Sequence, residues 1–328
     1  MIHPLRSKLC VFLFLFLSLG LKAQKEGVET AGNNEQIKYS NLDSWWSRTV
    51  KESRLIGGQE ITYFEPGPSA AEYQNIEGTL DGLTPWATSN VRAEVGVAAA
   101  NQSVYREPRG HGYCARLETN LKKVVVLGVV NVKAIASGSM FLGTMEDPIT
   151  DPNNPRHNTF MGIPFTHAPV ALAFDYKVQL GQKRQNATGG FRVKDIDGPD
   201  EAEVYMILQN RTEDEHGNLK VKRIGTAWQR FKQNQDTWVN GHQVPVIYGD
   251  ATNHRDYQPF MNLISEADPY YAKNSQGKRV SYIEEAWCDD TSQITHAIIV
   301  FSASYEGGAY IGSPDSRLWV DNIQLIYD

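Results

Sequence analysis

The chain has 328 residues, of which 41% are hydrophobic and 21% charged, and its formal net charge is -6. This balance is typical of a globular protein with a large core, built as one all-β domain or as two smaller ones. The negative charge and the absence of a lysine- or arginine-rich block argue against nucleic acid as a partner, because phosphate binding needs clustered positive charge.

The N-terminus has the three parts of a secretory signal peptide. Arg6 and Lys8 precede an apolar run at 11–21, and Ala23 offers a small residue at a cleavage point. The run is shorter than the roughly 20 residues that span a bilayer. We therefore expect residues 1–23 to be removed and the protein to be exported to the periplasm, the cell surface or the medium, with no transmembrane segment in the mature chain.

Beyond the cleavage point the chain divides into a leader and one large domain. Residues 24–38 are polar and without periodicity, which predicts a flexible leader. No repeat or Pro/Ser-rich linker divides 39–328, so we expect a single β-sandwich domain there. The segment 40–50 is ambiguous, because its apolar residues suit a short helix, but a short strand or turn is favoured.

Many short segments of the domain have strand-like patterns and are separated by turn signals such as 151–155 and 197–199. The absence of convincing long helices then predicts an all-β sandwich or barrel. The segments are Tyr113–Thr119, Val124–Val130, Lys133–Leu142, Val170–Leu180, Ala202–Gln209, Val221–Gln229, Gln258–Ile264, Thr295–Ser304 and Arg317–Tyr327.

The alternation of apolar residues within these segments predicts their buried faces. The final segment changes the parity of its apolar residues at Asp321-Asn322, which predicts a β-bulge. Gly138 lies between two serines without the context of a nucleophile, and we interpret it as a close approach between strands. The expected core is Leu172, Phe174, Val204, Met206, Ile298, Val300, Val320 and Ile323.

Compact catalytic motifs are absent from the sequence, including the P-loop, Gly-x-Ser-x-Gly, His-Glu-x-x-His and Cys-x-x-Cys. Glycoside hydrolysis needs only two facing carboxylates, which have no fixed linear spacing. The candidates on or beside strands are too numerous to select a pair: Glu94, Glu118, Glu146, Asp147, Asp175, Glu203, Asp289, Asp290 and Asp321.

Aromatic residues near turns are candidate platforms for a sugar. Sugar rings stack their C–H faces on aromatic rings, while their hydroxyl groups bond to polar side chains in a concave site. The same rings would equally serve a sandwich core. The candidate ligand-binding residues are Trp86, Trp228, Trp238, Trp287 and Tyr310.

Two further sets of side chains suit structural cross-links. Asp195, Asp197 and Asp200 gather carboxylates within six positions, as a structural Ca²⁺ would require, although ordinary turn chemistry explains them equally well. No other cofactor is expected. Cys114 and Cys288 remain after signal-peptide removal and could form a disulfide in an oxidising compartment, or each could be a small buried residue.

Several blocks, in this order, resemble the putative carbohydrate metabolism domain family of Bacteroidetes proteins. The resemblance implies an antiparallel jelly-roll β-sandwich, like galactose-binding and carbohydrate-binding modules. The blocks are Pro85–Asn90, Gly112–Glu118, Ala136–Gly143, Gly162–Phe165, Asp200–Leu208 and Leu318–Asn322.

The function implied by this resemblance is the handling of glycans. We expect an exported glycan-binding protein of polysaccharide utilisation, with an aromatic and polar groove and with outer-membrane glycan-utilisation partners. The family supplies no catalytic residues to carry over. Two alternatives stay open: a glycoside hydrolase that uses two carboxylates, and a structural subunit of the cell envelope.

Overall fold

The computed structural model describes residues 36–69, 82–126, 130–151 and 154–328. The predicted signal peptide and most of the predicted leader lie outside these residues. Gln36, near the end of that leader, is packed: its side-chain amide donates to Leu325 O and accepts from Leu325 N, both at 2.8 Å. Among the described residues, no helix has the length and hydropathy needed to cross a membrane.

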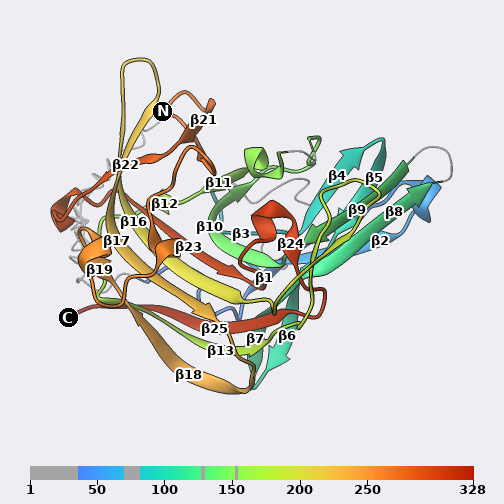
Figure 1. The fold of residues 1–328 in the computed structure, drawn as a ribbon, viewed down its shortest axis with the longest axis horizontal. Helices are drawn as coiled ribbons and strands as arrows, with labels where there is room; N and C mark the ends of the chain where they lie inside the picture. The colour runs from blue at the N-terminus through green and yellow to red at the C-terminus, as the bar shows by residue number, and fades with distance from the viewer. Residues whose placement is uncertain (1–35, 70–81, 127–129, 152–153) are drawn as a thin grey trace, which may run out of the picture. The chain divides into compact units, whose positions relative to one another are not determined.

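The described chain is all-β, as predicted, and its strands form one eleven-stranded sheet, one five-stranded sheet and four smaller sheets (Figure 1). The eleven-stranded sheet contains β3 (Trp86–Thr88), β10 (Ser139–Met145), β11 (Thr159–Met161), β12 (Ile163–Pro164), β16 (Ala202–Glu213), β17 (Leu219–Phe231), β19 (Ile247–Tyr248), β20 (Tyr270–Lys273), β21 (Arg279–Tyr282), β22 (Glu284–Trp287) and β23 (His296–Ser302). The five-stranded sheet contains β6 (Val104–Arg109), β7 (Gly112–Glu118), β13 (Ala171–Gln179), β18 (Gln235–Pro245) and β25 (Arg317–Ile326).

The smaller sheets are a three-stranded sheet and three hairpins. They contain β14 (Arg184–Asn186), β15 (Lys194–Ile196) and β24 (Ile311–Gly312), then the pairs β1 (Trp45–Lys51) with β2 (Glu60–Pro66), β4 (Val91–Val95) with β5 (Val97–Asn101), and β8 (Asn120–Val126) with β9 (Val130–Ala136). The helical turns in the described segments are all 3-10: Arg54–Ile56, Pro155–Asn158, Ala251–Asn253, Pro259–Met261, Thr291–Gln293 and Gly307–Ala309.

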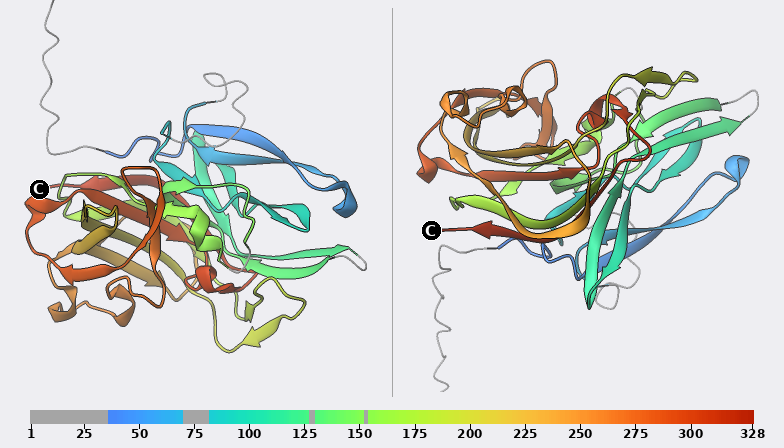
Figure 2. Two further views of the ribbon diagram at one scale, coloured as in Figure 1. Left: turned by 90° about the horizontal axis from the view of Figure 1, so that it is seen from above. Right: turned by 60° about the horizontal axis from the view of Figure 1, so that its bottom comes forward.

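The two large sheets pack as a sandwich around one core (Figures 1 and 2). Leu172 and Phe174 of β13 enter this core from the five-stranded sheet, and Val204 and Met206 of β16 enter it from the eleven-stranded sheet. Every residue of the predicted core is buried. Two of them lie elsewhere, however, because Ile298 and Val300 of β23 face the opposite side of the eleven-stranded sheet, where a second apolar cluster forms.

Most of the predicted strands are present, and the ambiguous segment 40–50 leads into β1 rather than a helix. The segment predicted as one strand at 133–142 is two strands, β9 and β10, which separate at Gly138. A Cβ at that glycine would lie 2.3 Å from both Glu118 N and Ser103 O, so the predicted close approach of strands is present. The strand predicted at 258–264 is wrong: a 3-10 turn forms there, beginning at Pro259, which lacks the N–H that a strand ladder needs.

The predicted β-bulge in the last strand is confirmed. Ala173 pairs with Gln324 and Asp175 pairs with Asp321, so β25 contains one more residue than β13 across this step. Asn322 takes up the extra residue with φ of 48°, a left-handed conformation that asparagine tolerates better than most residues. The bulge therefore re-aims the Asp321 side chain on the outer face of the five-stranded sheet.

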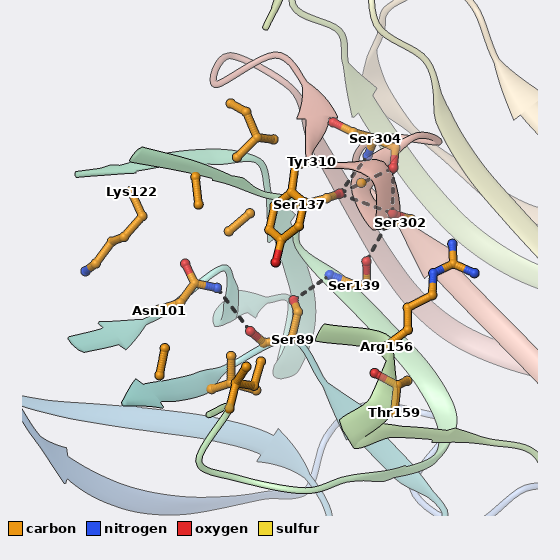
Figure 3. A pocket seen from close by; sticks show the side chains of 18 of the residues that line it. Ser89, Asn101, Lys122, Ser137, Ser139, Arg156, Thr159, Ser302, Ser304 and Tyr310 are labelled. Carbon is orange, nitrogen blue, oxygen red and sulfur yellow. Dashed lines mark hydrogen bonds between the residues drawn. The ribbon is translucent and has the colours of Figure 1, made fainter. Parts of the chain in front are cut away.

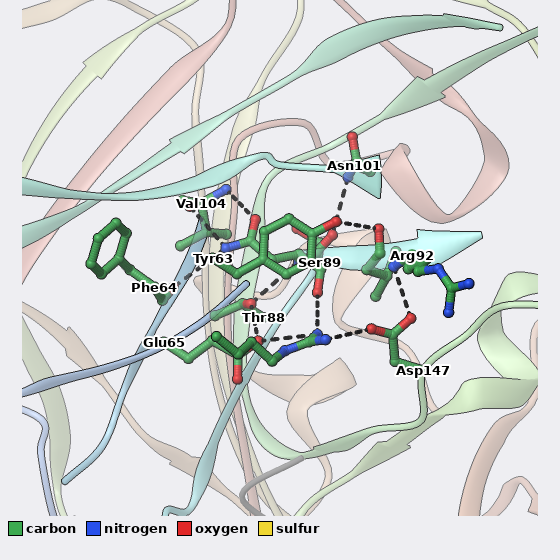
Figure 4. A network of polar contacts seen from close by, with 12 residues as sticks. Tyr63, Phe64, Glu65, Thr88, Ser89, Arg92, Asn101, Val104 and Asp147 are labelled. Carbon is green, nitrogen blue, oxygen red and sulfur yellow. Dashed lines mark hydrogen bonds and ion pairs between the residues drawn. The ribbon is translucent and has the colours of Figure 1, made fainter. Parts of the chain in front are cut away.

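A polar network anchors the hairpins to the rest of the domain (Figure 4). Asp147 accepts from Arg48 Nη1 at 2.7 Å and from Arg92 N at 2.8 Å, which ties β1 and β4 to the loop after β10. Asn90 Oδ1 accepts from Ser103 N and Val104 N, both at 2.9 Å. These bonds fix β4 and β5 beside the sandwich, where they form one wall of a pocket.

Candidate functional site

The pocket lies on the face of the eleven-stranded sheet that is turned away from the sandwich core. Along β16, Val204, Met206 and Leu208 enter that core, whereas Tyr205 and Ile207 belong to the cluster on the opposite face. The strand is therefore buried on both faces. Antiparallel sheets commonly have one solvated face, so this burial is unusual. Burial of this second face requires a cover, and other segments of the chain supply it.

One row of side chains across this face is polar. Strand register places Glu203 of β16 between Arg230 of β17 and Ser302 of β23, and Ser302 pairs in turn with Ser139 of β10. Arg230 Nε lies 3.2 Å from Glu203 Oε2, and Ser139 Oγ lies 3.0 Å from Ser302 Oγ. This row across four neighbouring strands thus places an ion pair next to two hydroxyl groups.

The adjacent row is aromatic and apolar. Tyr205 lies between Trp228 of β17 and Val300 of β23, and Val300 pairs with Phe141 of β10. The rings of Tyr205 and Trp228 stack with centroids 4.2 Å apart and an interplanar angle of 25°. The Tyr205 hydroxyl lies 2.8 Å from the Tyr270 hydroxyl, so this buried phenol has a polar partner.

A pocket of about 310 Å³ lies over these two rows (Figure 3). Its floor includes Ser139, Phe141 and Tyr205, and its opposite wall comes from the hairpins β4–β5 and β8–β9. The turn at 307–309 and Tyr310 complete the lining. The absence of a side chain at Gly307 lets the turn close this side of the pocket. A Cβ at Gly307 would lie 2.4 Å from Ser137 Cβ, so the turn packs directly against the segment after β9.

Glu203 is the one carboxylate among the described residues that line the pocket. Only 9% of its side chain is exposed. Its Oε2 accepts from Trp228 Nε1 and Arg230 Nε, each at 3.2 Å. Burial raises the pKa of Glu203 to about 7, against the opposing effect of the Arg230 charge. Near neutral pH this carboxyl therefore occurs both protonated and ionised.

Arg156 brings a second charge to the same end of the pocket. Its guanidinium lies 5.5 Å from the centre of the Tyr270 ring, and its Nη1 lies 2.7 Å from Asp268 Oδ1. A Cβ at Gly308 would lie 2.3 Å from Arg156 Nη2, so the backbone of this turn lies close against the guanidinium. Figure 3 shows Arg156 rising from the segment before β11 beside Thr159.

The hydroxyl groups of the floor bond chiefly to each other and to the backbone. Ser302 Oγ donates to Ser304 O at 2.9 Å, and the hydroxyls of Ser137 and Ser139 lie 3.2 and 3.0 Å from Ser302 Oγ. Ser304 Oγ donates in turn to Asp200 Oδ2 at 2.5 Å. The hydroxyl hydrogens are thus already used within the protein, and the floor offers mainly acceptor positions to a ligand.

The aromatic residues predicted as ligand-binding separate in the structure. Trp86 is only 2% exposed and its Nε1 donates to Lys38 O, so it belongs to the sandwich core. Trp228 stacks on Tyr205 but does not itself line the pocket. Tyr310 lines the pocket, and burial raises the pKa of Tyr310 to about 12. Trp238 and Trp287 lie away from the pocket lining, each close to an arginine, so the five rings do not form one groove.

The carboxylates predicted to bind calcium are not brought together. Asp195 is paired with Lys183 at 2.7 Å near the surface, whereas Asp200 is buried and accepts from Ser304, Ser316 and Ser313 N. Asp197 instead contributes its backbone O, which accepts from Arg184. Within the described part of the chain, no group of three His, Cys, Asp or Glu side chains could hold a metal ion.

Cys114 and Cys288 are both free thiols, so the disulfide considered from the sequence is not formed. Cys114 lies in β7 of the five-stranded sheet, and Cys288 follows β22 at the edge of the eleven-stranded sheet. Burial raises the pKa of the Cys114 thiol to about 12. This thiol is therefore protonated and unreactive at neutral pH.

Two of the candidate carboxylates, Asp175 and Asp321, lie together on the outer face of the five-stranded sheet. Arg109 Nη1 donates to Asp175 Oδ2 at 2.8 Å and to Asp321 Oδ2 at 2.6 Å. Asp175 also accepts from Gly241 N and Asn322 Nδ2, and these bonds lower its pKa although burial opposes the shift. Both carboxylates serve to hold β18 and the bulge of β25 in place.

A sequence signal for Glu203 exists in the block 202–208. Eight consecutive residues of β16, 202–209, are buried, which is typical of a strand covered on both faces. A charged residue inside such a run is costly unless it has partners. The anomaly of one carboxylate within that run could therefore have selected Glu203 from the longer set of candidates.

The family described as the putative carbohydrate metabolism domain matches residues 64–326. Among solved structures, the chain is similar to a putative glycoside hydrolase from Bacteroides thetaiotaomicron VPI-5482, with 19% identity and a TM-score of 0.48 over 87% of this chain and 71% of that one. It is also similar to a putative glycoside hydrolase from Bacteroides vulgatus ATCC 8482, with 16% identity and a TM-score of 0.47 over 87% and 98%. Both likenesses are distant and assign no activity. No curated protein matches the sequence. Since the family match extends over most of the domain, the chain belongs to the putative carbohydrate metabolism domain family.

Proposed function

We propose that this protein is an exported glycan-binding protein whose ligand occupies the pocket over β16 and β23. The proposal rests on the two adjacent rows of side chains on the pocket floor, one polar and one aromatic. There Glu203 and its partner Arg230 lie beside the ring of Tyr205. A sugar presents both hydroxyl groups and an apolar C–H face, so a site for it needs both kinds of contact side by side. Membership of a carbohydrate metabolism family supports this ligand class.

Glu203 and Arg156 are the groups that would orient the sugar. A carboxylate accepts hydrogen bonds from two sugar hydroxyls, and a guanidinium donates to hydroxyl or ring oxygens. Such charge-assisted bonds are stronger than bonds between neutral groups. The rings of Tyr205 and Tyr310 add apolar contact from the floor and the rim of the pocket.

The export part of the proposal rests on the N-terminal sequence alone. The charged start, the apolar run and Ala23 support cleavage before Gln24. Intact mass of the protein recovered from the cell envelope or medium tests this. A mass that begins at Gln24 supports export, and a cytoplasmic product that retains Met1 contradicts it.

A glycan array combined with a reducing-sugar assay on the same polysaccharides tests the binding function. We expect binding without release of reducing ends, and we expect Glu203→Gln to weaken binding about tenfold to a hundredfold, which corresponds to the roughly 1.5–3 kcal/mol of a charged hydrogen bond. Trp238→Phe is the control, because Trp238 is not among the residues that line the pocket. Silence on the whole array, with folded protein, would contradict the proposal and favour a structural role in the cell envelope.

A glycoside hydrolase is the second candidate, and the pKa of Glu203 near 7 favours it. A carboxyl that is partly protonated at neutral pH is what a general acid requires. The mechanism also needs a second carboxylate roughly 5–9.5 Å away, whereas Glu203 stands alone among the described lining residues. Release of reducing ends that disappears in Glu203→Gln, while binding persists, would establish this candidate instead.

A further inference from the structure

The wall of the pocket that faces the sheet is apolar over most of its area. Val91 and Ala93 of β4, Val97 and Ala99 of β5, and Val124 of β8 line it, together with Val132 and Ala134 of β9. Val97, Ala99 and Val124 pack against one another as a small cluster. In contrast to the floor, this wall has polar side chains chiefly at Asn101 and Lys122.

A bare sugar fits this wall poorly. Every sugar hydroxyl that leaves water must find partners, and an unpartnered one weakens binding. Valine and alanine side chains offer none, and the bonded serines of the floor offer mainly acceptor positions. The polar groups suited to a sugar, Glu203 and Arg156, lie toward one part of the floor, so most of the wall remains for an apolar group.

We propose that the pocket binds a glycan residue that carries an ester-linked acyl group, with the sugar at Glu203 and Arg156 and the acyl chain between the hairpins β4–β5 and β8–β9. This inference rests on the proposed glycan-binding function and adds the class of ligand. An acyl chain requires no hydrogen bonds and gains from removal of apolar surface from water, both on the chain and on the wall. The two chemistries of the pocket thus match the two parts of one ligand.

Alkyl β-glucosides with methyl, butyl, hexyl and octyl chains test the apolar part by isothermal titration calorimetry. We expect affinity to rise about fourfold for each added methylene, the equivalent of about 0.8 kcal/mol, until the wall is filled. Methyl and octyl glucosides that bind equally would overturn the inference. If the affinity rises with every added methylene and never reaches a plateau, the chain is associating with exposed surface. That result would also overturn the inference.

Two neighbouring residues of β8 provide a matched pair of variants. Val124 lines the pocket and is 8% exposed, whereas Val125 points to the other side of the hairpin and is 61% exposed. Val124→Trp should fill the pocket and abolish the dependence on chain length, and Val125→Trp should leave it unchanged. If Val124→Trp does not fold, Ala134→Leu on the neighbouring strand takes its place. The smaller side chain should reduce the dependence of affinity on chain length rather than abolish it. Equal behaviour of the filled and control variants would contradict the assignment of the wall.

Saponified polysaccharide separates this inference from the function on which it rests. We expect a polysaccharide that binds on the array to lose affinity at least tenfold when mild alkali removes its acyl esters. If the saponified form binds equally well and Glu203→Gln weakens both, the acyl inference fails and glycan binding stands. If octanoate binds and no glycan does, both the acyl-glycan inference and the proposed function fail.

Discussion

Glu203→Gln should make the protein more stable at neutral pH, although it removes a side chain proposed to bind ligand. The pKa of Glu203 rises from 4.5 to about 7 because the carboxyl is buried. Each pH unit between the folded and unfolded pKa values corresponds to about 1.36 kcal/mol. Ionised Glu203 therefore costs the folded protein about 3 kcal/mol, which is a large part of the roughly 5–15 kcal/mol of a typical domain.

The direction of this effect follows from the raised pKa of the folded state. Stability due to protonated Glu203 is fully present below about pH 4.5 and is lost as the pH rises to about 7. Glutamine resembles the protonated form and keeps an oxygen that can accept from Trp228 and Arg230. The variant should match the wild type near pH 4.5 and exceed it by about 3 kcal/mol at pH 8.

Urea unfolding followed by tryptophan fluorescence at pH 4.5 and pH 8 measures this difference. Glu215→Gln is the control, because the Glu215 side chain is 86% exposed near the β16–β17 turn and its loss should change stability little at either pH. A stability difference between wild type and Glu203→Gln that is the same at both pH values would refute the reasoning. So would a variant that is less stable than the wild type at pH 8.

Three other substitutions or treatments have definite outcomes. Arg223→Met should lose about 3–5 kcal/mol in urea unfolding, because both Arg223 and its partner Glu284 are fully buried and the carboxylate would be left unpaired; a loss below 1 kcal/mol would contradict this. Trp86→Ala should lose about 3–5 kcal/mol, as expected for a buried aromatic ring, and a protein that melts at the wild-type temperature would place the ring outside the core. Unfolding without reductant should expose Cys114 and Cys288 to iodoacetamide, and peptide mass spectrometry should show an adduct on each of these two residues.

The sequence predicted strands best where one face is apolar and the other polar. β13 and β25 follow that pattern, and both their positions and the bulge at Asn322 were predictable. β18 was missed because most of its residues are exposed, so its composition resembles a loop. It forms because the edge of β13 offers unpaired backbone groups, and that information is not local to the segment.

The candidate site was less predictable than the fold for a related reason. Glu203 is one carboxylate among many in the sequence, and its pKa is raised by burial against the opposing effect of Arg230 and Trp228. The hairpins that cover its face of the sheet come from distant parts of the chain. The same applies to Trp86, whose burial reflects packing that its neighbours in sequence do not reveal. The alternation of apolar and polar residues along a strand predicts which face of the strand is buried, but it does not predict which segment covers that face.

The bonds between Gln36 and Leu325 join positions 289 residues apart, and Ser40 O accepts from Ile323 N in the same region. These bonds of Gln36 and Ser40 therefore cannot form until the last strand exists. Folds dominated by contacts this distant in sequence form slowly, because a long loop must close before the contact contributes any stability. We expect the contacts of Gln36 and Ser40 with β25 to form only at the end of synthesis, because β25 is the last strand to emerge.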